Sequence, residues 1–221
     1  MKKFASCLIL LVLLISISSC VVTNNLYIND PAPQGKGNYK SYMGIGTGTW
    51  LLGDSTIILN DKPAKYFMFP EAALGFKYGV GPKTNLHLAM HVPLTISGLG
   101  LKIGFQQSFF EANAPFNLAL GADIGGTIAG NKIFGISFNE NENRGAFNAD
   151  FFMPLSLKFN ESLKLIMTPR YSFNTYFVSQ KNIANFTVMS AGISYKKNLF
   201  EASVLFNNEY FLPRVGYIRN F

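Results

Sequence analysis

The fold is decided by stretches such as residues 86–95, LHLAMHVPLT, in which apolar side chains alternate with polar or small ones. The same period of two runs through residues 71–80, 116–125 and 163–172. A period of two places neighbouring side chains on opposite faces of a β-strand. Each stretch is about ten residues long, which is the length that a tilted strand needs to cross a membrane.

Weaker alternating stretches fill the rest of the chain, and no long helical pattern appears. Together the stretches predict about ten strands, within a range of 8 to 12, because the connection near Ser97 is shorter than its position requires. The weaker strands are expected at residues 41–51, 100–109, 146–157, 185–196, 199–207 and 213–221.

The connections between these strands alternate in length. Short ones are expected at residues 81–83, 111–115, 160–161 and 196–198, and long polar ones at residues 52–65, 129–145 and 174–184. Short turns at one end and long loops at the other are typical of membrane-spanning β-barrels. An even number of strands would return both chain ends to the side of the short turns.

Alternation alone does not decide which face meets water, but the less apolar face does. That face is rich in Gly and Ala, and charged residues make up only 14% of the chain, where a soluble domain averages roughly 25%. A narrow barrel interior has room for small residues and a few paired ions. The sequence therefore predicts an all-β, antiparallel, up-and-down transmembrane β-barrel. The alternative is a lipid-anchored soluble β-barrel that binds an apolar ligand in its interior.

Residues 41–221 resemble the small outer-membrane β-barrel proteins in this pattern of strands and connections. The chain also ends on Phe221 after an alternating strand that places Val215 and Tyr217 on one face, and this resembles the assembly signal of such barrels. The resemblance implies a place in the bacterial outer membrane. It implies outer-membrane lipids and the barrel-assembly machinery as partners.

The first twenty residues, MKKFASCLILLVLLISISSC, are typical of a secretory signal. Lys2 and Lys3 precede an apolar run at residues 8–17, which is too short to span a bilayer as a helix. Ile17–Cys20 resembles the lipobox of bacterial lipoproteins. An ordinary signal peptide in which Cys20 is incidental is the alternative.

The lipobox resemblance implies that the signal, residues 1–19, is cleaved before Cys20 by the lipoprotein-processing machinery. It further implies a diacylglycerol on the Cys20 thiol and an N-acyl chain on the new N-terminus, with no other cofactor expected. No Asp follows Cys20, so by the same resemblance the lipid is expected in the inner leaflet of the outer membrane. We expect residues 20–40, which show no periodicity, to form the lipidated N-terminus and a flexible tether before the barrel domain at residues 41–221.

The less apolar face of the predicted strands carries four basic and four acidic side chains together with both histidines of the chain. A selective pore needs an excess of one sign, so this balance favours a structural network that closes the lumen. A small-solute channel is the alternative. The members of the predicted lumen network are Glu71, Lys77, His87, His91, Lys102, Asp123, Asp150, Lys164, Arg170 and Glu201.

Several kinds of chemistry find little support. His87 and His91 are four residues apart on a strand, about 13 Å, which is too far to share a metal ion. The lipobox resemblance implies that Cys7 leaves with the signal and that Cys20 is acylated, so neither would provide a disulfide, a nucleophile or a metal ligand. The glycines of residues 44–48 resemble a phosphate loop only superficially, since no helix follows them.

Scattered Lys and Arg residues argue against nucleic-acid binding, and no spacing of Ser, His and an acid indicates catalytic residues. The expected function is therefore a non-enzymatic structural or surface-interaction protein of the cell envelope. A barrel enzyme acting on envelope lipid is a further alternative. The sequence makes no prediction of an oligomeric state.

Overall fold

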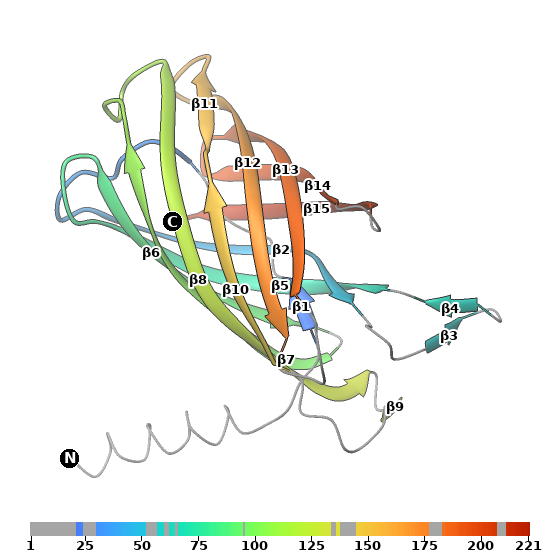
Figure 1. The fold of residues 1–221 in the computed structure, drawn as a ribbon. Coiled ribbons are helices and arrows are strands. Elements are labelled where there is room, and N and C mark those ends of the chain that lie inside the picture. Colours follow the sequence, from blue (N-terminus) through green and yellow to red (C-terminus); the bar gives the residue numbers. More distant parts are fainter. Residues whose placement is uncertain are drawn as a thin grey trace, which may run out of the picture.

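The structure, a computed structural model, describes residues 21–23, 30–51, 57–59, 62–64, 66–94, 96–133, 136–137, 145–176, 183–206 and 211–221. These residues form β-strands joined by turns (Figure 1). Among them, no helix is long and apolar enough to span a membrane. The expected signal at residues 1–19 and Cys20 lie outside the described residues.

Antiparallel strands form a closed barrel of ten positions, because β2 pairs with β5 on one side and with β15 on the other. The short strands β10 and β11 both pair with β8 and β12, so they are two halves of one barrel strand. This confirms the predicted fold class. The barrel strands are β2 (Tyr39–Leu51), β5 (Tyr66–Gly79), β6 (Thr84–Pro93), β7 (Ile96–Ser108), β8 (Phe116–Ile133), β10 (Gly145–Phe152), β11 (Leu155–Lys158), β12 (Leu163–Tyr176), β13 (Ile183–Tyr195), β14 (Asn198–Phe206) and β15 (Phe211–Asn220).

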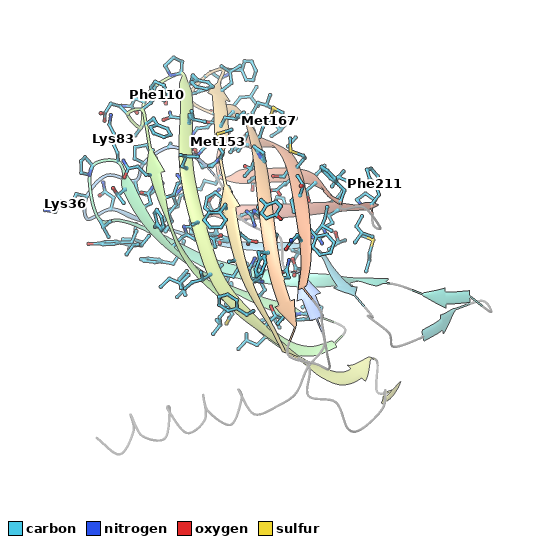
Figure 2. All side chains as sticks on the ribbon, in the orientation of Figure 1. Lys36, Lys83, Phe110, Met153, Met167 and Phe211 are labelled. Atoms are coloured by element: carbon cyan, nitrogen blue, oxygen red, sulfur yellow. The ribbon has the colours of Figure 1, made fainter. Side chains whose placement is uncertain are left out.

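The short turns lie at one end of the barrel, which we call the short-turn end. They follow β5, β7, β11 and β13, and the shortest contains only Lys196 and Lys197. β2 begins at this end and β15 finishes there, as an even number of strands requires. Figure 2 shows Lys36, Lys83 and Phe110 at this end and Phe211 at the opposite one. We call the opposite end the long-loop end.

Four further strands lie at the long-loop end. β3 (Ile57–Leu59) and β4 (Lys62–Ala64) form a hairpin that projects away from the barrel between β2 and β5, and β9 (Ile136–Ser137) pairs with the end of β8 (Figure 1). β1 (Val21–Thr23) pairs with residues 49–51 of β2. β1 also lies against β8 and β10, which stand across the barrel from β2.

The two faces of the wall have opposite chemistry. In β10, Asp150 points inward and is 1% exposed, while the next residue, Phe151, points outward and is 62% exposed. A soluble barrel would show the reverse, with apolar side chains inside. The structure therefore does not support the alternative of a soluble barrel. An apolar belt on a wall without free edges suits lipid. The exposed apolar side chains include Met43, Ile45, Leu74, Phe76, Leu88, Leu101, Ile103, Phe105, Leu120, Ile124, Phe151, Met167, Met189, Ile193, Phe200 and Val215.

The expected tether differs from the structure in the part that is described. Residues 30–38, which we call the inward segment, fold back against the barrel, and Asp30 through Pro33 are buried. A run of Pro and Gly gives these residues no strand period, so the sequence alone does not indicate where they dock. Residues 24–29 lie outside the described residues.

Candidate functional site

The barrel lumen is the candidate functional site, and its centre is an ion network. Lys102 on β7 donates a hydrogen bond from Nζ to Oδ2 of Asp150 on β10 at 2.6 Å. Arg170 on β12 places Nη1 3.5 Å from the same oxygen. All three side chains are almost fully buried. Since an isolated buried charge is strongly disfavoured, the folded barrel needs these three side chains to be paired with one another.

A second polar contact reaches across a strand. His87 on β6 and Asp123 on β8 are in contact between Nε2 and Oδ1, although β7 lies between their strands. The residue between them is Gly104, which pairs with His87 on one side and with Asp123 on the other. A Cβ atom at Gly104 would overlap the Asp123 carboxylate, so glycine at this position makes the contact possible.

Gly125 has the same role for the central network. It lies on β8 beside Lys102, and a Cβ atom there would stand 2.5 Å from Lys102 Cγ and 2.9 Å from Oδ1 of Asn148. The Lys102 side chain therefore passes over Gly125 to reach Asp150 on the next strand. The glycines of the inward face thus decide which charged side chains can meet.

The inward segment closes on a third group of polar side chains near the short-turn end. Lys77 on β5 donates from Nζ to the backbone oxygen of Asp30 at 2.7 Å and to Oε1 of Gln106 at 3.2 Å. The amide of Gln106 donates to the same Asp30 oxygen at 3.1 Å. Lys164 on β12 donates to Oδ2 of Asp30 at 3.0 Å. Asp30 therefore joins three strands from inside the lumen.

Further contacts hold the rest of the inward segment. Ser108 Oγ donates to the backbone oxygen of Pro31 at 2.5 Å, and the Gln34 N–H donates to Oδ1 of Asn85 at 2.9 Å. Gly79 at the end of β5 forms backbone hydrogen bonds with Gly37 and Asn38. These bonds fix residues 30–38 at the short-turn end of the lumen.

All ten residues of the predicted lumen network lie on inward faces of their strands. The structure brings Lys102, Asp150 and Arg170 together and pairs His87 with Asp123. Lys77 and Lys164 instead contact Asp30. Glu71 and His91 are fully buried elsewhere in the lumen, and Glu201 lies on the inward face of β14. Among the described residues, no three His, Cys, Asp or Glu side chains are grouped to hold a metal ion.

The prediction missed three charged residues of the lumen. Arg214 is 3% exposed and shares the inward face of β15 with Leu212 and Ile218, so strict alternation could have found it. Asp30 lies before the first barrel strand, where no period exists. Arg214 and Asp30 add one charge of each sign to the lumen, and Lys40, the third missed residue, adds an ammonium group close to Asp30 at the short-turn end.

The environment of Asp30 favours its ionised form. Burial acts to raise the pKa of the carboxyl, but the ammonium groups of Lys164, Lys40 and Lys77 and the N–H of Ala32 outweigh it and lower the pKa below its usual range. A lowered pKa stabilises docking above the unfolded pKa of about 3.9. The stabilisation is lost as the pH falls through the lower pKa of the docked carboxyl.

We therefore expect the inward segment to stay docked from neutral to mildly acidic pH and to loosen only below about pH 4. Hydrogen–deuterium exchange of residues 30–38 in detergent-purified protein, corrected for the intrinsic exchange rate at each pH, would measure this. Asp30→Asn is the matched variant and should show equal protection at pH 3 and at pH 5. Loosening of the native segment at pH 6 would contradict the expectation.

A hollow on the outer face marks the break between β10 and β11. Its lining is mostly apolar and includes Phe105, Leu120, Phe151, Met153 and Tyr171, and Figure 2 shows Met153 and Met167 on this part of the wall. The Phe152 ring, 3% exposed, has the Arg170 guanidinium 5.4 Å from its centroid. The hollow therefore faces the surrounding lipid.

No protein-family model matches the chain, and no curated protein sequence does. Solved structures resemble its architecture. The COG4313 outer membrane channel from Pseudomonas putida F1 has a TM-score of 0.48 and 11% identity, and the match covers 89% of this chain and 100% of that one. The outer membrane protein OprG from Pseudomonas aeruginosa has a TM-score of 0.40 and 14% identity, with 86% and 99% covered. The closed wall with its apolar exterior makes this chain a barrel of the outer-membrane type.

Proposed function

We propose that the chain is an outer-membrane β-barrel lipoprotein with a non-enzymatic, structural or surface-interaction role and a lumen that is closed to solutes. The observation that carries this proposal is the filling of the lumen. Lys102, Asp150 and Arg170 form a buried network on the inner wall, where Lys102 of β7 reaches over β8 to Asp150 of β10, and the inward segment occupies the short-turn end of the lumen.

The chemistry of the lumen favours closure over conduction. A conducting pore needs sites that a solute enters and leaves easily, with one sign of charge in excess. Here the central charges are buried and bonded to one another, so a solute would have to replace bonds between protein groups. Large inward side chains such as Phe152 and Tyr42 fill further space beside glycines.

A small-solute channel is the second candidate, and one observation favours it. Residues 30–34 are held by side-chain bonds and by one ion pair with Lys164, whose side chain is 26% exposed. A barrel strand is held by a backbone ladder along its whole length, so the inward segment is the part of the lumen that is most easily displaced.

Conductance in planar lipid bilayers separates the two candidates. We expect the native protein to insert with little or no ionic conductance, and deletion of residues 30–34 to raise it several-fold because the short-turn end is then open. Lys36→Ala is the matched control, since Lys36 lies in the same segment but is exposed. Steady pore-like conductance of the native protein would favour the channel.

Acylation of Cys20 is the other part of the proposal, and it is supported by the lipobox resemblance. We expect the protein to incorporate a palmitate analogue in growing cells and to lose the label in Cys20→Ala. Cys7→Ala is the matched control and should keep it. The Cys20→Ala barrel should remain in the membrane pellet after a carbonate wash, because its apolar belt anchors it. Release into the soluble fraction would contradict the membrane-spanning fold.

A further inference from the structure

The described N-terminal residues lie at both ends of the barrel. At the long-loop end, β1 pairs with residues 49–51 of β2. The edge of β2 is free for this pairing because its ladder with β15 ends at Gly46. β1 also lies against β8 and β10 on the opposite wall. A strand in contact with opposite walls lies within the mouth of the barrel.

At the short-turn end, Asp30 is buried inside the lumen at the level of Lys77, which is the neighbour of Lys40 on β2. Lys40 and Thr49, the partner of Thr23, are nine residues apart on one strand. At about 3.3 Å per residue and a tilt of about 45°, they differ by about 21 Å along the barrel axis.

The length of chain between Thr23 and Asp30 matches this height. Seven Cα–Cα steps reach at most about 25 Å. A path that left the lumen and passed outside the closed wall would have to be longer.

From this geometry we infer that the N-terminal chain passes through the lumen from the short-turn end to the long-loop end. Cys20 is bonded to Val21, so we place it at the long-loop end as well. The position of its lipid rests on the proposed lipidation. The short turns of outer-membrane barrels face the periplasm. The lipid on Cys20 is then presented at the outer surface of the cell, where the sequence alone favoured the inner leaflet.

Labelling of introduced cysteines in intact cells tests this direction, with the unsubstituted chain as the background for its own Cys20. Thr23→Cys should react with a maleimide that does not cross the membrane, as should Ser137→Cys at the long-loop end. Lys36→Cys at the short-turn end should react only after the outer membrane is permeabilised. The inference is overturned if Thr23→Cys behaves like Lys36→Cys.

A second variant covers the case in which Thr23→Cys is too enclosed to react. Thr23 and Thr49 are directly paired, so Thr23→Cys with Thr49→Cys should form a disulfide that changes gel mobility without reductant. Thr23→Cys with Thr84→Cys, at the short-turn end, should not. Absence of labelling together with absence of the first disulfide would overturn the inference.

A palmitate analogue, followed in cells that carry Thr23→Cys alone or with Thr49→Cys, separates this inference from the proposed lipidation. Acylated protein with neither the surface labelling nor the disulfide means that the lipidation stands and the path through the lumen is wrong. Disulfide formation without acylation means that the path stands and the lipid is absent.

Discussion

Asp150→Ala is expected to destabilise the barrel by about 3–5 kcal/mol, because it leaves Lys102 and Arg170 buried and close together without their shared carboxylate. The midpoint of urea unfolding in detergent micelles, followed by tryptophan fluorescence or by the loss of the folded band on gels, would measure the change.

Two further variants make the Asp150 prediction specific. Asp150→Leu combined with Lys102→Met removes one charge of each sign and should recover part of the lost stability. Glu161→Gln removes a carboxylate that is bonded to Lys158 in an exposed turn and should leave the midpoint unchanged. If Asp150→Ala unfolds at the native midpoint, the central network does not support the fold.

Gly125→Val should have the second large effect, a loss of about 3 kcal/mol or more. The new Cβ would overlap the course of Lys102 and the Asn148 side chain, so overpacking is combined with weakening of the Lys102–Asp150 pair. The same unfolding midpoint reports the loss.

The adjacent glycine provides the control for Gly125. Gly126 faces outward, and the nearest atom to an added Cβ there is the Ala146 backbone oxygen at 3.5 Å. Gly126→Val adds a β-branched residue to a lipid-facing strand and should be tolerated. Equal effects of the two substitutions would show that strand propensity, and not the crossing of Lys102, decides the result.

Local patterns predict the wall of this barrel well. The period of two in residues 86–95 and its counterparts reports directly on which side chains face lipid, because successive residues of a strand point to opposite sides. The short connections, such as that at residues 81–83, fix which strands are neighbours. The limits of the strands are predicted less well: β7 begins at Ile96 where residue 100 was expected, and β8 extends to Ile133 into an expected loop.

The contacts inside the lumen are less accessible from sequence. Alternation places Lys102 and Asp150 on the inward face, but their meeting depends on Gly125 of the strand between them, and such a pairing leaves no local signal. The position of Asp30 is harder still to predict, since its partners come from β5, β7 and β12 and its own segment has no period. Neither the composition of an irregular segment nor the spacing of its residues indicates which distant strands it packs against.

The seam between β2 and β15 gives the proposed path of the chain a mechanical consequence. It contains only the five residue pairs from Tyr42–Asn220 to Gly46–Gly216, whereas β2 and β5 share thirteen. These are the first and last strands of the barrel, so their pairing closes the ring. A tail that lies inside when the ring closes is enclosed by the wall, and the acyl chains proposed for Cys20 would be too bulky to pass back through the filled lumen. Such a tail is released only when the seam opens, and the attachment of the lipid then lasts as long as the barrel stays folded.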